Sequence, residues 1–435
     1  MDTLFSGVTA VTMDKSFRVI KDAYVGVTGQ KISFVGQTPP EESAARVIKG
    51  ARKVLMPGLC NAHTHAAMTL LRGYADGYAL QEWLFKHIFP AEERMTDESV
   101  YWGVSLAALE MAASGTVSFT DMYDHSLAVG RAAEESGLKA NLTRALMTSD
   151  ENFNFAADPR AAEARELESR FHMLDGGRIM VDASVHAEYT SNRALWEQTA
   201  QYAKDRKLGM NVHVSETRRE HEECKAKYGK TPARVLFEAG LFGVRAACAH
   251  CVWVEDGDIE LMRGAGASAV HNPVSNQKLA SGAAPVPKML AAGLNAALGT
   301  DGMASNNSHD LFEEIKAAAI MHKYTQNDPT VITAEQALRM AVNGGFVSQG
   351  RGDETGVIAP GRDADLILLD FDKPHLTPCH DVVSNLVYSA RGSDVVMTMA
   401  RGRSLYENGE FKVQDAERIM REFRKSAEIY SAPGA

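Results

Sequence analysis

The amino-acid sequence predicts an α/β fold: a (β/α)8 TIM barrel accompanied by a small β-sandwich domain that is built from both chain ends. Between residues 57 and 355, apolar strand-like runs alternate with amphipathic helical stretches, a pattern typical of a parallel sheet covered by helices. Residues 1–56 and 356–435 contain mainly short strand-like runs and, at the very end, one helix. We therefore expect the barrel to be one domain and the two ends to form the other.

Strand-like runs bounded by turn residues occupy both ends of the chain. They are residues 4–11, 23–27, 31–35 and 53–56 at the start, and 364–369, 382–387, 395–399 and 404–406 at the end. After the last run, Asn408-Gly409 is a strong hairpin signal. We expect strands from the two ends to pair with one another beside the barrel.

The middle of the chain contains the alternating elements. The expected strands include residues 117–119, 140–142, 179–181, 209–212, 246–248, 268–270 and 295–298, and the expected helices include 98–114, 127–136, 161–174, 192–206 and 231–239. About eight such repeats over roughly 300 residues fit a closed barrel. A doubly wound sheet is the alternative, but no G-x-G-x-x-G fingerprint follows a strand.

Composition narrows the classes of function. Of 435 residues, 45% are hydrophobic and 23% are charged, which are ordinary values for a globular chain with a sizeable core. The formal net charge is −10. Nucleic acids and anionic membranes both favour a basic protein surface, so neither is expected as a partner.

The sequence also suggests the cellular compartment of the protein. The chain starts without a basic, then apolar, leader segment, and the apolar run at 104–113 contains Glu110 and is too short to span a membrane. Five scattered cysteines do not form a disulfide framework. They are Cys60, Cys224, Cys248, Cys251 and Cys379. We expect a cytoplasmic protein with reduced thiols.

The first candidate site is Asn-Ala-His-Thr-His at residues 61–65, which closes an apolar run. Alternate residues of a strand share a face, so His63 and His65 point the same way. Two imidazoles side by side at the end of a buried strand provide half of a metal site. For an isolated H-x-H, two histidines satisfied by hydrogen bonds are the alternative.

Further polar residues close the later predicted strands, where barrel active sites gather. They are His186, His213, Glu216, His250 and Asp301. Three imidazoles and one carboxylate suit Zn²⁺ or Fe²⁺ with one position open for water. Such a cation lowers the pKa of its water from about 15.7 toward 7. Glu216, three residues after His213, is then well placed to transfer protons.

Several longer stretches carry a family resemblance. They are residues 56–73, 213–217, 249–252, 268–279, 298–307 and 356–366. These stretches resemble the amidohydrolase superfamily and, within it, the branch of methylthioadenosine and S-adenosylhomocysteine deaminases. The resemblance extends over essentially the whole chain.

The resemblance implies one divalent ion held by His63, His65, His213 and Asp301, with zinc as the expected metal and iron as the alternative. The absence of an obvious bridging lysine at the fourth strand fits a single metal. Glu216 would protonate the ring nitrogen and the departing amine, while His250 and Asp301 would orient the attacking water.

The same resemblance implies residues that bind substrate. They are Trp83, Glu92, Arg144, His186, Glu216 and Ser305. Glu92 matches a carboxylate that holds a ribose diol, and Arg144 matches an arginine associated with the amino-acid tail of S-adenosylhomocysteine. A second arginine for that tail is represented only by Arg160. Glu188 stands where relatives commonly have proline, which changes the charge expected near the base.

These expectations together indicate a hydrolytic deaminase of 5′-substituted adenosines, such as 5′-methylthioadenosine, S-adenosylhomocysteine or 5′-deoxyadenosine, giving the inosine analogue and ammonia. One alternative keeps the site but changes the heterocycle to guanine, an 8-oxopurine or an s-triazine. Another alternative is a barrel that binds ligands without catalysis. The expected partner is a small-molecule nucleoside, and the family resemblance suggests a homo-oligomer.

Overall fold

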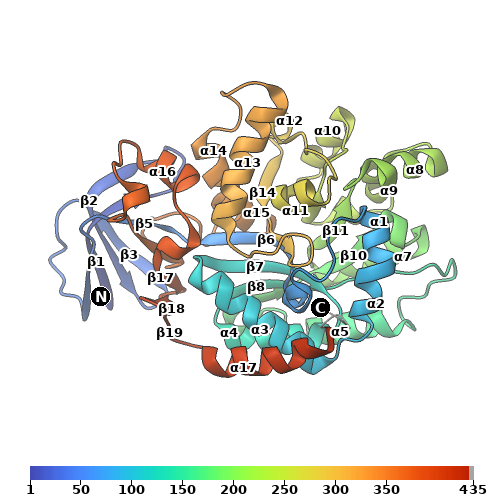
Figure 1. Ribbon diagram of the computed structural model, residues 1–435, viewed down its shortest axis with the longest axis horizontal. Coiled ribbons are helices and arrows are strands. Elements are labelled where there is room, and N and C mark those ends of the chain that lie inside the picture. Colours follow the sequence, from blue (N-terminus) through green and yellow to red (C-terminus); the bar gives the residue numbers. More distant parts are fainter. Residues whose placement is uncertain (431–435) are drawn as a thin grey trace.

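The computed structural model describes residues 1–430 and has two parts. Figure 1 shows helices around a central set of strands, with a second sheet at one end of the molecule. Both chain ends contribute strands to this second sheet, and the last helix returns to the outside of the barrel. The α/β fold expected from the sequence is confirmed.

The barrel consists of two five-stranded parallel sheets, with orders β15-β6-β7-β8-β9 and β10-β11-β12-β13-β14. Their strands are β6 (Leu59–His65), β7 (Thr116–Tyr123), β8 (Lys139–Arg144), β9 (Ile179–Val181), β10 (Ala183–Ala187), β11 (Met210–Val214), β12 (Ala246–His250), β13 (Ser268–His271), β14 (Asn295–Leu298) and β15 (Asp301–Gly302). Asp182 alone separates β9 from β10, and two residues separate β14 from β15. Each of these two pairs occupies one strand position of the barrel, which we call a stave. Residues 1–430 therefore contain a barrel of eight staves.

Helices connect and cover the staves. They are α1 (Leu80–Trp83), α2 (Phe89–Glu92), α3 (Asp97–Ala113), α4 (Ser126–Ser136), α5 (Pro159–Phe171), α6 (Leu174–Gly177), α7 (Arg193–Arg206), α8 (Arg218–Tyr228), α9 (Pro232–Glu238), α10 (Asp256–Gly264), α11 (Pro273–Lys278), α12 (Val286–Ala291), α13 (Leu311–Gln326), α14 (Ala334–Arg339) and α15 (Gly345–Ser348). The five helices predicted from the sequence are all present. Local capping explains where they begin: the Thr96 side chain accepts a hydrogen bond from the Ser99 amide and starts α3.

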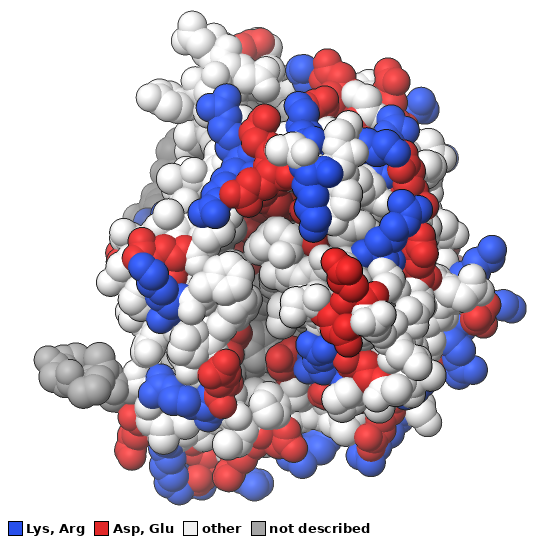
Figure 2. Space-filling model, turned by 90° about the vertical axis from the view of Figure 1, so that its right-hand side faces the viewer, with Lys and Arg blue, Asp and Glu red and all other residues white. Residues whose placement is uncertain are grey.

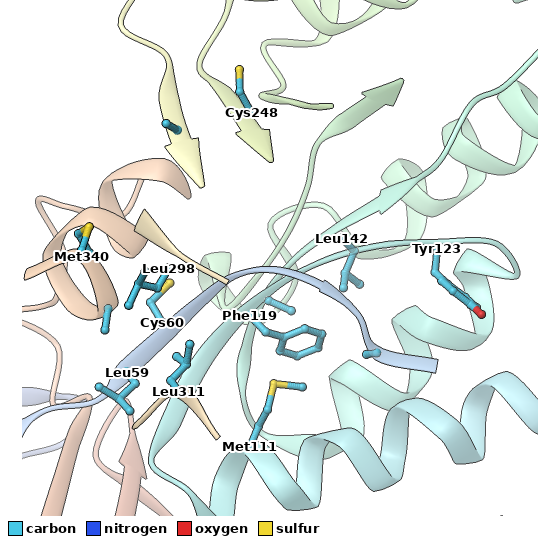
Figure 3. Packing of buried hydrophobic residues seen from close by; sticks show 14 of the residues in the cluster. Leu59, Cys60, Met111, Phe119, Tyr123, Leu142, Cys248, Leu298, Leu311 and Met340 are labelled. Carbon is cyan, nitrogen blue, oxygen red and sulfur yellow. The ribbon is translucent and has the colours of Figure 1, made fainter. Parts of the chain in front are cut away.

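The barrel core is apolar on both sides of the strands. Every residue of β7 is buried, as expected for a parallel strand that is covered on both faces. Small side chains fill the lumen, where Ala62, Ala247, Val270 and Ala297 form one cluster. Outside the strands, Phe119 of β7 and Met111 of α3 point toward one another in the larger cluster (Figure 3).

The second domain is a nine-stranded sheet made by both chain ends, with order β19-β18-β17-β16-β5-β1-β2-β3 and β4 beside β1. The strands are β1 (Thr3–Val11), β2 (Val19–Thr28), β3 (Lys31–Gly36), β4 (Arg46–Lys49), β5 (Lys53–Pro57), β16 (Leu366–Asp370), β17 (Val395–Ala400), β18 (Arg403–Glu407) and β19 (Glu410–Phe411). β5 pairs with β16, which joins the two ends as predicted. The Ile32 amide also donates to the Arg362 carbonyl (2.9 Å), so the sheet folds around a core of its own.

The C-terminal segment contains one correct and one wrong prediction. Tyr406 pairs with Phe411 around Asn408-Gly409, so the predicted hairpin is confirmed. Residues 382–387 were expected to form a strand but form helix α16 (Val382–Tyr388). The Asp381 side chain accepts hydrogen bonds from the amides of Val383 and Ser384 and starts the helix. Burial of Leu386 and Val387 outweighs the strand preference of the β-branched valines in this segment.

Two further segments lie outside the staves, and the first of them contributes to the pocket described below. Between β6 and α3, the chain forms η1 (Ala66–Leu71), α1, the π-helical turn η2 (Leu84–Ile88) and α2. Near the C-terminus, α17 (Ala416–Ala427) packs on α3. Within residues 1–430, every helix is either too short or too polar to cross a membrane.

Candidate metal centre and substrate pocket

Four side chains predicted to bind metal meet at the carboxyl ends of the staves. The Nε2 atoms of His63 and His65 lie 3.3 and 3.2 Å from Asp301 Oδ1. His213 Nε2 lies 3.2 Å from His63 Nε2 and 3.3 Å from His65 Nε2. The structure therefore brings together residues from β6, β11 and β15 that are far apart in the sequence.

The chemistry of these donors fits a cation. His65 Nδ1 lies 2.6 Å from the Met122 carbonyl oxygen, and His213 Nδ1 lies 2.6 Å from that of His186. A carbonyl only accepts, so both Nδ1 atoms carry the proton and both Nε2 atoms present lone pairs. Lone pairs 3.3 Å apart repel unless a positive centre lies between them. Such carbonyl partners typically orient metal-binding histidines.

His250 lies beside this group but has different hydrogen bonds. His63, His213, His250 and Asp301 offer ligand atoms within 4.8 Å of one another. The amide nitrogens of Asn276 and Asn272 face His250 Nδ1 at 3.0 and 3.3 Å. Nδ1 then accepts, and in the neutral ring Nε2 carries the proton. His250 is thereby suited to donate a hydrogen bond toward the centre, whereas His65 is suited to coordinate.

Several residues at or next to this site have unusual backbone conformations. Ser215, His250, Cys251 and Asp301 all have positive φ, between 49° and 71°. Residues with a Cβ rarely occupy this left-handed region, and such strain concentrates at functional sites. Each lies at or just beyond the carboxyl end of a stave, so the chain turns sharply exactly where the side chains converge.

Asp301 is held by hydrogen bonds on its second oxygen. Ser275 and Ser305 donate to Oδ2 at 2.7 and 2.9 Å, which leaves Oδ1 facing the histidines. Burial raises the pKa of Asp301, but the adjacent imidazoles of His63 and His65 outweigh that effect and hold the pKa well below its usual value. Asp301 is therefore an anionic ligand at neutral pH.

Glu216 is a buried carboxyl group beside the same centre. Its Oε2 lies 3.8 Å from His250 Nε2, and Ser281 donates to Oε1 at 3.4 Å. Burial first, then the negative charges of Asp301 and Glu220, raise the pKa of Glu216 well above its usual value. A carboxyl group that keeps its proton in this position is able to act as an acid.

A pocket leads from these residues to the surface and has about 670 Å³ of atom-free space, including its open mouth. The face toward which β6 runs is hollowed near its centre, with basic and acidic side chains interspersed around the hollow (Figure 2). Of the predicted substrate residues, Trp83, Glu92, His186, Glu216 and Ser305 line the pocket.

Glu92 lies along the wall of the pocket. Tyr123 donates a hydrogen bond to Oε1 of Glu92 at 2.7 Å. Burial raises the pKa of Glu92 to about 7, despite the opposing hydrogen bond from Tyr123. The other carboxylate oxygen is available to accept hydrogen bonds from a ligand.

His186 packs next to the metal-binding group, with its ring 4.7 Å from that of His213. Its Nδ1 lies 2.9 Å from Thr190 Oγ1. Burial and the nearby histidines lower the pKa of His186 to about 3, so the ring is neutral.

Two residues considered in the sequence lie outside the pocket lining. The Arg144 guanidinium donates to Glu163 Oε2 at 2.6 Å and is also paired with Asp124. Glu188 is buried against Cys224 and Lys227, and burial raises its pKa. The charge change expected from Glu188 therefore does not face a ligand in the pocket.

Sequence reasoning missed several lining residues, including Tyr123 and Asp124, because the expected strand at 117–119 was too short. β7 continues to Tyr123, so the strand end that carries them was misplaced. The supporting residues Ser275, Ser281 and Asn276 lie in loops and in a short helix, where hydrophobic periodicity gives no signal.

Comparison with known proteins agrees with this geometry. The model of the amidohydrolase family matches residues 54–405. The chain is 44% identical over 428 residues to a 5′-deoxyadenosine deaminase of Methanosarcina acetivorans, and this match covers 98% of both chains. It is 40% identical over 428 residues to a 5-methylthioadenosine/S-adenosylhomocysteine deaminase of Thermoanaerobacter pseudethanolicus, covering 98% of this chain and 99% of the relative.

Among solved structures, an adenosine deaminase from Xanthomonas campestris with bound zinc superimposes with a TM-score of 0.93. The two chains are 32% identical, and the match covers 99% of this chain and 98% of that one. The family match extends over most of the sequence and the structural match over nearly all of it. The chain belongs to the amidohydrolase family.

Proposed function

We propose that this protein is a metal-dependent hydrolytic deaminase of 5′-substituted adenosines, which releases ammonia and the inosine analogue. The observation that carries the proposal is the distribution of groups in one pocket. The side chains that we propose as metal ligands and Glu216 lie at its deep end, and the carboxylate of Glu92 lies along its wall. The names of the relatives at 40 and 44% identity support this substrate class.

His63, His65, His213 and Asp301 would hold one divalent ion. Bound there, the ion supplies Lewis acidity, which makes water a nucleophile at neutral pH. We propose zinc, because imidazole nitrogen and carboxylate oxygen suit it and because the adenosine deaminase of similar fold contains it. Iron(II) accepts the same donor set and is the alternative.

His250 and Asp301 would orient the attacking water from two sides. The protonated Nε2 of His250 donates a hydrogen bond, and the carboxylate of Asp301 accepts one. Fixing a nucleophile in this way removes much of the entropic cost of bringing it to the ring carbon.

Glu216 would supply the protons that the reaction needs. Its carboxyl group faces the pocket in a buried position, so it is able to protonate the ring nitrogen, to take a proton from the attacking water, and to pass that proton to the amine. Amide anion is a very poor leaving group, whereas ammonia leaves readily. Proton transfer of this kind typically contributes about 10²–10⁴-fold to the rate.

Glu92 and Trp83 would bind the rest of the nucleoside. One carboxylate oxygen of Glu92 accepts from Tyr123, and the other would accept from the ribose hydroxyls. Trp83 is buried at the pocket wall with its Nε1 donating to the Ala75 carbonyl oxygen at 3.3 Å. Its ring is therefore fixed in a position that excludes water from the base.

A substrate panel tests the proposal. Metal-replete protein should release ammonia from 5′-deoxyadenosine or 5′-methylthioadenosine, with loss of adenine absorbance and the mass of the inosine analogue. Glu92→Ala should lose about 10²-fold in kcat/KM for nucleosides, because it removes a buried acceptor of substrate hydroxyls. Glu93→Ala is the matched control, since Glu93 is exposed. Turnover of guanine or an s-triazine in place of adenosines would refute the substrate class.

Two accompanying proposals concern the whole protein. All five cysteines are free, which supports a reducing compartment such as the cytoplasm. The expected homo-oligomer stays a prediction, and light scattering of the purified protein checks it.

A further inference from the structure

Beyond Glu92, the rim of the pocket carries a carboxylate that the proposed chemistry does not use. Asp124 lines the pocket and follows Tyr123, the residue that holds Glu92. About half of its side chain, 49%, is exposed. Ala145 and Met147 line the same part of the pocket. A nucleoside with its base at Glu216 and its ribose at Glu92 would direct its 5′ substituent here.

The nearest guanidinium, that of Arg144, is already occupied. Its Nε donates to Glu163 Oε2 at 2.6 Å, and its Nη1 pairs with Asp124 and donates to the Ala145 carbonyl oxygen at 2.6 Å. Only 7% of the side chain is exposed. Glu163 is itself fixed by Ser126, whose amide and hydroxyl donate at 2.6 and 2.9 Å. Turning Arg144 toward a ligand would leave the carboxylates of Glu163 and Asp124 without their cation, which is costly because Glu163 is only 24% exposed.

The second nearby arginine is also paired. Arg160 donates from Nη2 to Asp158 Oδ2 at 2.8 Å, while Asp158 Oδ1 caps α5. Three carboxylates therefore face two guanidinium groups: Asp124, Glu163 and Asp158 against Arg144 and Arg160. Of these five side chains, Asp124 alone lines the pocket. Burial raises the pKa of Asp124, while the guanidinium of Arg144 opposes that shift and favours the ionised form.

We propose, on the basis of the proposed function, that Asp124 selects the 5′ substituent of the nucleoside by its charge. Neutral and cationic substituents are accepted, and a substituent that carries a carboxylate is disfavoured. A carboxylate would meet the negative charge of Asp124 without a free cation to balance it, and such repulsion is an effective source of specificity.

The test uses three thioethers of 5′-deoxyadenosine with tails of similar length: 5′-propylthio (neutral), 5′-(2-aminoethylthio) (cationic) and 5′-(carboxymethylthio) (anionic). For the full-length, metal-loaded protein, kcat/KM for the anionic analogue should be about tenfold below that of the neutral one, as one unbalanced charge at a half-exposed position implies. The cationic analogue should equal or exceed the neutral one. Equal kcat/KM values for the anionic and the neutral analogue would overturn the proposal.

Variants locate the effect. In Asp124→Asn, kcat/KM for the anionic analogue should rise about tenfold, and kcat/KM for the cationic analogue should no longer exceed that for the neutral one. For the neutral analogue, kcat/KM should stay within about twofold of the value for the parent protein. Asp158→Asn is the matched control, because Asp158 belongs to the same cluster but does not line the pocket; it should leave the three ratios unchanged. Unchanged ratios in Asp124→Asn would overturn the role of this residue.

The outcomes separate this inference from the proposed function. If 5′-deoxyadenosine is deaminated but the three analogues are not ranked by charge, only the role of Asp124 fails. If none of the nucleosides releases ammonia, the proposed function fails and this inference fails with it. Should Asp124→Asn not fold, the ranking of the analogues by the unaltered protein still decides.

Discussion

At the scale of single residues, the proton on each histidine ring decides its role. The backbone carbonyls of Met122 and His186 fix the Nδ1 protons of His65 and His213, so two lone pairs face Asp301 and His63. Asparagine amides set the opposite arrangement at His250. Neighbouring imidazoles are thereby divided into rings suited to coordinate a cation and a ring suited to donate a hydrogen bond.

Replacing Glu216 tests the proton-transfer role. Glu216→Gln keeps the shape of the side chain but removes the acidic proton, so kcat should fall by about 10²–10⁴-fold. The metal content should not change, because Glu216 is not among the proposed ligands. Steady-state ammonia release with metal analysis on the same sample checks this. A kcat close to that of the parent protein would contradict the role.

Glu314 gives a prediction for stability. It is buried and accepts hydrogen bonds from the Val274 amide at 3.1 Å and from Asn306. Burial raises its pKa from 4.5 to about 8. Between these values the folded state keeps a proton that the unfolded state has released, so the free energy of unfolding falls as pH rises.

In Glu314→Gln this dependence should disappear. The stability of the parent relative to the variant should decrease from pH 5.5 to pH 8, by up to about 1 kcal/mol per pH unit. Urea unfolding of both proteins at three pH values measures it. A difference that stays constant or grows with pH would show that Glu314 is ionised in the folded state.

Much of the candidate metal site was predictable from the sequence, because strand alternation and strand ends are visible in hydrophobic patterns. His63, His65, His213 and Asp301 were all placed correctly at the ends of staves. The surroundings of Arg144 could not be predicted. Which carboxylates pair with a guanidinium depends on tertiary contacts between β8 and α5, and local sequence does not encode them.

At the scale of elements, the start of α8 supports the active site. The Thr217 side chain accepts from the Glu220 amide at 3.2 Å, and the Glu220 side chain accepts from the amides of Ser215 and Glu216 at 2.9 and 2.7 Å. This capping box fixes the turn that carries Glu216. The start of α8 and the position of Glu216 thus depend on the same hydrogen bonds.

Thr217→Ala should lower the free energy of unfolding by about 1 kcal/mol, the usual effect of losing such a cap. It should also reduce kcat by about tenfold, because the Glu216 turn loosens and small misplacements are expensive in catalysis. Thr333→Ala is the matched control, since Thr333 caps α14 in the same way but its neighbours in the chain do not line the pocket, whereas Glu216 next to Thr217 does. Thr333→Ala should lower the free energy of unfolding but leave kcat unchanged. Equal effects of both variants on kcat would contradict the link.

The elements also show where sequence patterns fail. Periodicity identified the long helices and the buried staves, but it assigned residues 382–387 to a strand. Alternating and helical patterns are hard to distinguish over a few β-branched residues. The deciding interactions were the Asp381 cap and the burial of Leu386 and Val387. Burial of this kind depends on neighbours that a short window does not contain.

At the scale of the whole molecule, a buried ion cluster connects the barrel to the β domain. Lys139 of β8 donates to Asp363 at 2.7 Å and to Asp365 at 2.5 Å. Only 1% of the lysine side chain is exposed. The segment that leaves the barrel for the β domain is therefore held against a barrel strand.

Lys139→Met should destabilise the protein by about 3–5 kcal/mol, because the buried carboxylate of Asp365 loses its counter-ion and that of Asp363 keeps only the exposed Lys31. Lys31→Met is the matched control: Lys31 also pairs with Asp363, at 2.6 Å, but is 52% exposed. Lys31→Met should lower the free energy of unfolding by less than about 1 kcal/mol. Chemical unfolding monitored by tryptophan fluorescence compares the two. A small effect of Lys139→Met would show that the cluster does not hold the domains together.

The most direct measurement is a metal titration of chelator-stripped protein during ammonia release from 5′-deoxyadenosine. We expect no activity without metal, a linear rise as zinc is added, and saturation at one ion per chain. His63→Ala should abolish both binding and activity. Full activity in the stripped protein, or bound zinc that leaves ammonia release unchanged, would contradict the metal-dependent deaminase that the geometry supports.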